Sequence, residues 1–234
     1  MKQLCGTRDV LCIEGPGQGK SLALDCSMAS QVEGLSRCIA DDLGLDEIDV
    51  AGVSFGGRLG LALSRTGLVR RLHVTGVGIR REEDALQRIE DWKGMLRVEG
   101  GLEAFSGGLI SASYSKAFLE KNKPCLPKWQ NFIVEQNTRE GLERLISQSH
   151  ASSDDDIYGV RNSLRSCSSE SVRFLLGGED VVVAKDIAGA MDELLEAERE
   201  VEVEAEGKIV GGCGHVLNME WSIGWRKDVE KYLE

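Results

Sequence analysis

Hydrophobic residues along the chain form short apolar runs, separated by stretches in which apolar positions recur every three or four residues. The short runs predict buried strands at residues 10–13, 48–52, 72–77 and 172–176, and a last strand from residues 201–203 together with 208–210. The stretches with helical spacing predict helices over residues 28–43, 58–65, 187–194 and 225–233, the first with a capping box at Ser30 and Glu33. Because strands alternate with helices, the pattern predicts an α/β fold with a mostly parallel sheet and flanking helices.

The alternation stops between residues 79 and 166, where the chain is polar and helical. This segment predicts a helical cap inserted into an α/β core that residues 1–78 and 167–234 form together. Aromatic residues of the cap are candidates for the lining of an apolar acyl pocket, although aromatic residues at helical spacing also form the core of such a cap. The candidates are Trp92, Phe105, Phe118 and Trp129.

The length and charge of the chain exclude several classes of function. The 234 residues suffice for one domain with a sizeable core, and the net charge of -11 argues against a nucleic-acid partner, which would need clustered Lys and Arg. No apolar stretch reaches the ~20 residues of a membrane-spanning helix. The first residues lack the apolar run of a secretory signal, and seven scattered cysteines show neither paired nor metal-like spacing. We therefore expect a soluble intracellular protein, cytoplasmic or organellar, with small buried cysteines; no metal or organic cofactor is implied.

The segment Gly52-Val53-Ser54-Phe55-Gly56 has the pattern of a nucleophile elbow, in which a serine sits on a sharp turn between a strand and a helix. A structural turn also uses glycine, but this segment follows a predicted strand and opens a predicted helix. The glycines allow the sharp turn, and the helix directs its N-terminus at developing negative charge. We expect Ser54 to be a nucleophile, with the backbone N–H of Phe55 as the first donor to an oxyanion.

Three histidines are candidates for the base that a serine nucleophile needs. His73 lies within a predicted strand and His150 in a polar stretch of the cap, whereas His215 follows the last strand in a glycine-rich loop. This position favours His215. The orienting acid should follow the strand that precedes the loop, where Glu179 and Asp180 are adjacent; Asp180 is the first choice, and Glu179 is the alternative if the turn shifts by one residue.

These motifs resemble those of the α/β-hydrolase superfamily, in particular its small esterases, lactonases and peroxidase-like members with a helical cap. Residues 14–21 resemble the turn after the fourth strand of that family, residues 50–57 its elbow, and residues 177–180 and 212–220 its acid and histidine loops. The resemblance covers nearly the whole chain and supports a triad in the order Ser54, Asp180, His215. It implies a serine hydrolase that acts on an ester, thioester or lactone, with a small-molecule acyl substrate.

The sequence also departs from that family at its beginning. The family starts with three further strands, and the loop after the third carries the second oxyanion donor, whereas this sequence starts just before the fourth strand. We expect an α/β-hydrolase fold that lacks the first three strands, so that the fourth and fifth strands pair directly, a protein partner completes the sheet, or the chain is a fragment. The alternative function is therefore a catalytically impaired hydrolase-like domain that serves as a structural or binding subunit of a larger assembly.

Overall fold

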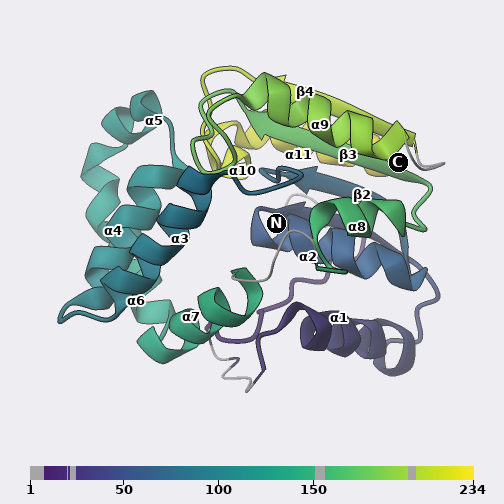
Figure 1. The fold of residues 1–234 in the computed structure, drawn as a ribbon, viewed down its shortest axis with the longest axis horizontal. Helices are drawn as coiled ribbons and strands as arrows, with labels where there is room; N and C mark the ends of the chain where they lie inside the picture. The colour runs from purple at the N-terminus through teal and green to yellow at the C-terminus, as the bar shows by residue number, and fades with distance from the viewer. Residues whose placement is uncertain (1–7, 20, 22–24, 151–155, 200–203) are drawn as a thin grey trace.

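A parallel sheet forms the centre of the molecule in the computed structural model, which describes residues 8–19, 21, 25–150, 156–199 and 204–234. Among these residues the sheet has four strands in the order β1-β2-β3-β4 (Figure 1). The strands are β1 (Ile48–Val53), β2 (Val69–Thr75), β3 (Ser171–Gly177) and β4 (Glu204–Val210). The parallel α/β architecture predicted from the sequence is confirmed.

Helices cover both faces of this sheet. Each strand lies next to the one before it, and right-handed crossovers in one direction place the connecting helices on one face. That face carries α2 (Phe55–Leu63), α8 (Val160–Arg165) and α9 (Ile187–Arg199), with α1 (Met28–Arg37) packed on α2. The opposite face is covered by α11 (Ser222–Leu233), which the short helix α10 (Leu217–Glu220) precedes.

The main core lies between the sheet and the helices of the first face. Its largest fully buried side chains are aliphatic or aromatic and come from strands and helices alike, including Leu61, Leu72, Leu164, Phe174 and Leu194. A smaller cluster around Leu175, Leu217 and Trp225 joins the sheet to α10 and α11. Central strands buried on both faces explain why β2 and β3 appear in the sequence as nearly continuous apolar runs.

Helices from the middle of the chain gather beyond one end of the sheet, at the left in Figure 1. They are α3 (Glu83–Leu96), α4 (Gly101–Ser113), α5 (Lys116–Lys121), α6 (Leu126–Gln136) and α7 (Arg139–Leu145). A second cluster around Leu96, Phe105 and Leu142 forms their shared interior. The division into a core and a cap of residues 79–166 stays a prediction; α8, which falls inside that range, contributes Val160 and Leu164 to the main core.

The prediction of a buried strand at residues 10–13 is wrong. This segment forms no strand, and Val10, Leu11 and Ile13 are 38%, 59% and 54% exposed. A parallel strand needs a neighbour for its backbone hydrogen bonds, and among the described residues β1 is an edge strand that pairs only with β2. Apolar composition alone therefore does not hold residues 10–13 in the sheet.

The first helix begins earlier than its capping-box pattern predicts. Ser27, not Ser30, is the N-cap, and its Oγ accepts a hydrogen bond from the backbone N–H of Ser30 at 3.3 Å. The helix then continues through a π-helical turn, Cys38–Asp42, and ends before Gly44, which has a positive φ of 63°.

Only two of the six cysteines in the described part of the chain meet the expectation of small buried side chains. Cys26 and Cys213 are buried, whereas Cys12 and Cys125 are exposed, and Cys5 lies outside the described residues. All six cysteines of the described part of the chain are free thiols. In the same part of the chain, no helix combines the length and the apolar character that crossing a membrane requires.

Candidate active site

Ser54 occupies a sharp turn at the carboxyl end of β1. Its φ of 54° makes it the only non-glycine residue with a positive φ in the described chain, and its backbone N–H donates to the Thr75 carbonyl at 2.7 Å. The turn requires glycine at position 52, because a methyl group there would collide with the Gly56 carbonyl. Gly56 itself has open space around it, so the expectation that both glycines permit the turn holds only for Gly52.

His215 lies directly above this serine. Its Nε2 is 2.7 Å from Ser54 Oγ, and its ring is 6% exposed. The loop that carries it follows β4 and is tied to the end of α4 by the backbone N–H of His215, which donates to the Ser113 carbonyl at 2.9 Å. Gly76 lies against the imidazole ring, where a larger side chain would crowd it.

Asp180 completes the row of three side chains. Its Oδ2 is 2.8 Å from His215 Nδ1, while its Oδ1 accepts from the backbone N–H groups of Val182 and Val183 at 3.0 Å each. The carboxylate is 1% exposed, so these partners replace the water that it gives up on burial. The adjacent Glu179 is exposed, and the structure brings Asp180 rather than Glu179 to the histidine.

The other two histidines lie elsewhere. His73 is fully buried in β2, with Nε2 3.3 Å from Asp228 Oδ1 and rings of Trp225 and Tyr232 at its edge. Burial lowers its pKa, although Asp228 acts in the opposite direction. His150 lies in the π-helical turn that follows α7.

The predicted oxyanion donor belongs to the first residue of α2. Phe55 follows Ser54, and it lines the same cavity as Ser54 and His215. Backbone N–H groups in the first turn of a helix have no acceptor within the helix, and the helix dipole favours negative charge at this end. The chemistry that this arrangement offers is removal of a serine proton by an imidazole, with an N–H that can donate to the oxygen of the carbonyl under attack.

A cavity of about 320 Å³ opens beside these groups, between the sheet and the helices at its end. Trp92 and Phe105, two of the predicted pocket residues, line it, and their rings meet edge to face at 6.2 Å between centroids. Phe118 and Trp129 are not part of its lining; they stack 6.0 Å apart in a cluster with Tyr114. Trp92 and Phe105 also belong to the apolar interior of these helices, whereas Phe118 and Trp129 are half-buried and lie outside that interior; an acyl-pocket role for the four stays a prediction.

The sequence profile of the alpha/beta hydrolase family matches residues 2–221. The chain belongs to this family. No curated protein matches the chain, whereas many solved structures of hydrolases do.

Three of those hydrolase structures illustrate the likeness. The enol-lactonase of Burkholderia xenovorans is 17% identical, with a TM-score of 0.74, and the match covers 94% of this chain and 78% of the enzyme. A thermophilic esterase of Thermogutta terrifontis is 16% identical, with a TM-score of 0.71 and coverage of 94% and 77%. A meta-cleavage product hydrolase of Pseudomonas fluorescens is 20% identical, with a TM-score of 0.61 and coverage of 87% and 71%. At these identities the likeness shows the hydrolase fold and nothing finer.

One carboxylate near the site is not singled out by the sequence motifs. Glu220 accepts hydrogen bonds from the backbone N–H of Gly214 at 2.8 Å, from the backbone N–H of Ser115 at 3.0 Å and from Ser115 Oγ at 2.6 Å. It therefore ties the histidine loop to the start of α5. The sequence does not reveal these contacts, because they also depend on Ser115, which lies 105 positions away from Glu220.

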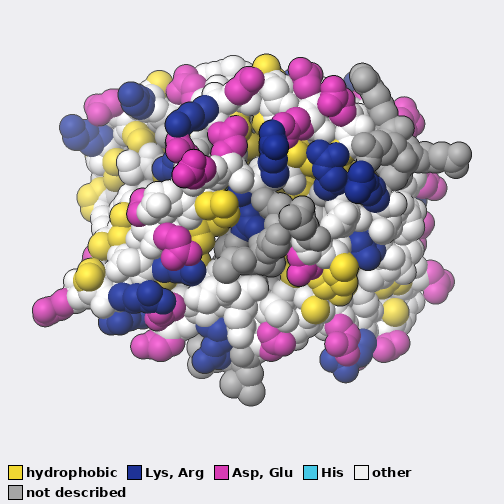
Figure 2. Space-filling view, viewed as in Figure 1, with side chains coloured by type: hydrophobic (Ala, Val, Ile, Leu, Met, Phe, Trp, Pro, Cys, Tyr) yellow, Lys and Arg dark blue, Asp and Glu magenta, His cyan; other side chains and the backbone are white. Residues whose placement is uncertain are grey.

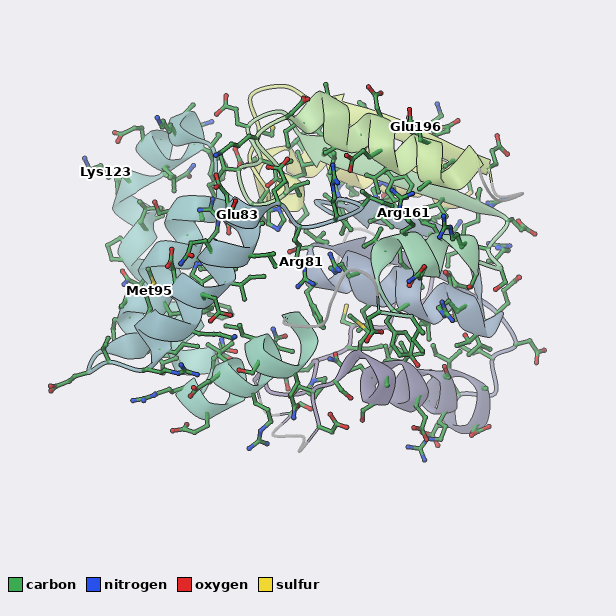
Figure 3. The ribbon with its side chains drawn as sticks, viewed as in Figure 1. Arg81, Glu83, Met95, Lys123, Arg161 and Glu196 are labelled. Atoms are coloured by element: carbon green, nitrogen blue, oxygen red, sulfur yellow. The ribbon has the colours of Figure 1, made fainter. Side chains whose placement is uncertain are left out.

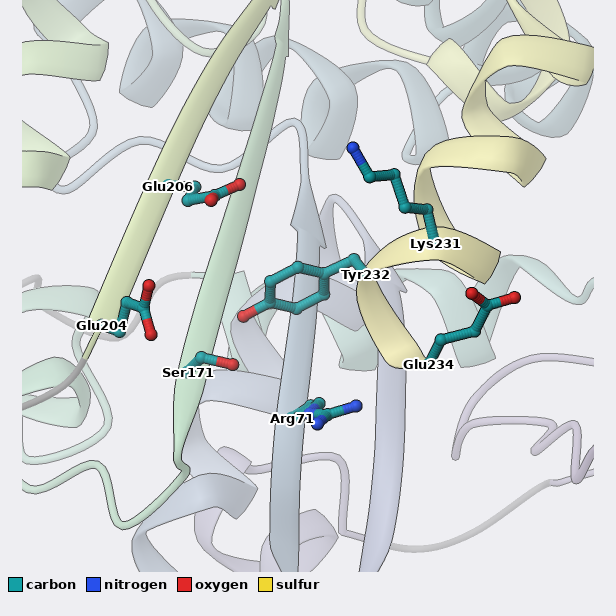
Figure 4. Close-up of a pocket in the computed structure, with 7 residues that line it drawn as sticks. All are labelled: Arg71, Ser171, Glu204, Glu206, Lys231, Tyr232 and Glu234. Atoms are coloured by element: carbon teal, nitrogen blue, oxygen red, sulfur yellow. The ribbon is translucent and has the colours of Figure 1, made fainter.

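A second cavity of about 270 Å³ lies where β2, β3 and β4 begin, at the opposite end of the sheet from Ser54 (Figure 4). It is lined by Arg71, Ser171, Glu204, Glu206, Lys231, Tyr232 and Glu234. Ser171 is the one serine in this lining, and the lining contains no histidine that could take the proton of its hydroxyl. The described residues also contain no cluster of His, Cys, Asp and Glu suited to a metal ion.

Proposed function

We propose that this hydrolase cleaves an ester, thioester or lactone, with Ser54 as the nucleophile. The observation that supports the proposal most is the 2.7 Å separation of Ser54 Oγ and His215 Nε2 on a turn that holds the serine in a strained conformation. A buried imidazole at this distance can take the serine proton as the oxygen attacks the substrate carbonyl.

The roles of the two partners follow from their contacts. His215 takes the proton of Ser54 and returns it to the leaving oxygen or sulfur, and then activates the water that releases the acyl group. Asp180 holds the Nδ1 side of the ring and stabilises the positive charge that the ring carries between these steps. The backbone N–H of Phe55 is the proposed donor to the oxyanion.

Replacement of the base tests the mechanism. We expect His215→Ala to lower kcat on a small activated ester such as p-nitrophenyl acetate by at least ~10³-fold, because Ser54 loses its proton acceptor. Circular dichroism and a thermal melt establish that the variant folds. Full activity in a folded H215A protein would contradict the assignment of the base.

The two adjacent carboxylates provide a matched pair for the acid. We expect Asp180→Asn to lower kcat by ~10³–10⁴-fold, because an amide can hold the ring in the wrong tautomer. The exposed Glu179→Gln should leave kcat within about two-fold, since surface substitutions that break no contact have small effects. Equal losses in the two variants would argue against Asp180 as the acid.

The alternative is a catalytically impaired domain in a larger assembly. It is favoured by the position of β1, whose outer edge has no neighbouring strand among the described residues and could accept one from a protein partner. A folded chain that hydrolyses no activated ester, and in which D180N and E179Q behave alike, supports this alternative.

A further inference from the structure

The cavity beside Ser54 is lined by positive charge in a protein that is otherwise acidic. Four arginines line it, none of its described lining residues is Asp or Glu, and the chain as a whole carries a net charge of -11. The arginines come from three parts of the molecule: Arg58 from α2, Arg80 and Arg81 from the segment between β2 and α3, and Arg88 from α3. In Figure 3, Arg81 lies between α3 and α2.

Arg88 lines the cavity and forms no ion pair with a described residue. It is half-buried, and its Nη2 donates to the Val181 carbonyl at 3.2 Å. Among the described residues that carbonyl is its only hydrogen-bond partner, its Nε is buried without a partner, and no carboxylate pairs with it. A half-buried guanidinium without a counter-ion keeps unsatisfied donors, and an anion that reached it would satisfy both its charge and those donors.

Arg80 differs from Arg88 because it has a paired carboxylate. Its Nη2 forms an ion pair with Glu193 at 2.7 Å, and its side chain is 70% exposed. Such an exposed and paired arginine contributes to the positive potential at the cavity but needs no ligand. The observations therefore single out Arg88 as the group that would bind an anion directly.

The remaining wall of the cavity is mostly apolar. Ile89 and Trp92 follow Arg88 on α3, and Phe105 and Val183 face them from α4 and the acid loop. An apolar wall with one unpaired guanidinium suits a molecule with an apolar body and one anionic end. A carboxylate matches the planar fork of a single guanidinium in shape and charge.

We propose that the cavity takes an ester or lactone whose apolar acyl chain ends in a carboxylate, and that Arg88 binds that carboxylate. The proposal rests on the proposed function and adds the substrate class to it. In the reaction the bond between the acyl carbon and the leaving oxygen breaks, the hydroxyl of water ends on the acyl carbon and its proton on the leaving oxygen. The distal carboxylate is unchanged, and its role is to position the acyl group.

Two esters of equal chain length test the proposal: p-nitrophenyl hexanoate, which is neutral, and the mono-p-nitrophenyl ester of hexanedioic acid, which ends in a carboxylate. We expect kcat/KM to be about 10- to 100-fold higher for the charged ester, the range for a charge-assisted hydrogen bond. Arg88→Gln should abolish this preference, and Arg88→Lys should keep part of it.

The matched control is Arg97→Gln. Arg97 follows α3, is 60% exposed, pairs with Glu143 at 2.8 Å and does not line the cavity, so this variant removes the same charge while keeping the preference. A preference for the neutral ester, or a preference for the charged ester that R88Q leaves intact, overturns the proposal. A stronger preference for a chain ending in a phosphate overturns the carboxylate assignment.

A binding measurement separates this inference from the proposed function. Calorimetry with hexanedioate on Ser54→Ala should show binding that weakens at least about ten-fold when Arg88→Gln is added. Such binding together with no hydrolysis of either ester by the wild-type protein would refute the proposed function and support the anion site. Absence of binding in a folded S54A protein would refute the anion site, whatever the wild type hydrolyses.

Discussion

At the scale of single residues, the turn after β1 is the most constrained part of the molecule. Ser54 keeps a positive φ that costs a non-glycine residue about 1–3 kcal/mol, and such strain persists only where the surroundings hold it. Here the Ser54 N–H is fixed to Thr75, and α2 packs tightly on the sheet through Gly57 and Gly60, beside which Val77 and Leu72 leave no room for a methyl group.

Two glycines of this turn should respond oppositely to the same substitution. We expect Gly52→Ala to lower the free energy of unfolding by about 3 kcal/mol, because its methyl group would meet the Gly56 carbonyl. Gly56→Ala should raise it by about 0.5–1 kcal/mol, because the position is open and alanine favours the helix. Urea unfolding of both variants checks this; equal destabilisation would contradict the described turn.

Which residues the sequence can reveal depends on whether their signal is local. The elbow around Ser54, the carboxylate pair after β3 and the one histidine in a loop after the last strand follow from chemistry and order along the chain. The proximity of Arg88 to the cavity and the contacts of Glu220 depend on segments far apart in the sequence, and no spacing rule reports them.

At the scale of elements, the histidine loop depends on its attachment to the helices at the end of the sheet. Ser113 binds the backbone of His215, and Glu220 joins Gly214 to Ser115. Three hydrogen bonds to one carboxylate make Glu220 a positioning residue for His215, although it touches neither Ser54 nor the cavity.

Glu220→Gln tests that role. The amide keeps the size of the side chain but loses the charge that strengthens all three hydrogen bonds, so we expect the free energy of unfolding to fall by about 2 kcal/mol. We also expect kcat on an activated ester to fall by about ten-fold or more with KM little changed, because the misplaced ring affects the chemical step. Loss of stability with an unchanged kcat would show that the contact is only structural.

The element predictions succeeded where apolar residues are buried by neighbours within the chain. β1, β2 and β3 lie within two or three residues of their predicted positions, α9 and α11 cover the predicted helices, and α2 begins and ends two or three residues earlier than predicted. Residues 10–13 have an equally apolar sequence but no adjacent strand, and they stay exposed. Strand formation depends on a partner that the local pattern cannot report.

At the scale of the whole molecule, the buried ionisable groups of β2 and β3 lie apart from the proposed catalytic groups. Acidic and basic side chains are interspersed on the face that the space-filling view shows (Figure 2). The proposed catalytic groups all follow the carboxyl ends of parallel strands, where connecting loops converge on one edge of the sheet. His73 of β2 and Arg173 of β3 instead contact Asp228 of α11, away from that edge.

The burial of His73 makes global stability depend on pH. His73 is held neutral by burial, which lowers its pKa, so below pH ~6.5 the unfolded chain takes up a proton that the folded chain does not. The free energy of unfolding should therefore decrease as the pH falls from 7 to 5. Hydrogen bonds from His73 and Arg173 outweigh burial and hold the pKa of Asp228 well below its usual range, so that group contributes no slope in this window.

We expect His73→Gln to reduce this pH dependence. Urea unfolding at pH 7, 6 and 5 should give a smaller decrease for the variant than for the wild type, because the carboxylates that titrate below this range are common to both. A decrease of the same size in both proteins would contradict a neutral, buried His73.

An activated nucleophile at Ser54 should react with a fluorophosphonate probe. The probe reacts only with a serine whose proton can be removed, so we expect one probe per chain on the peptide that contains Ser54, as read by intact mass and peptide mapping. Labelling should disappear in Ser54→Ala and slow strongly in His215→Ala. A wild-type protein that folds but takes up no probe, or takes it up equally in S54A, would contradict the claim.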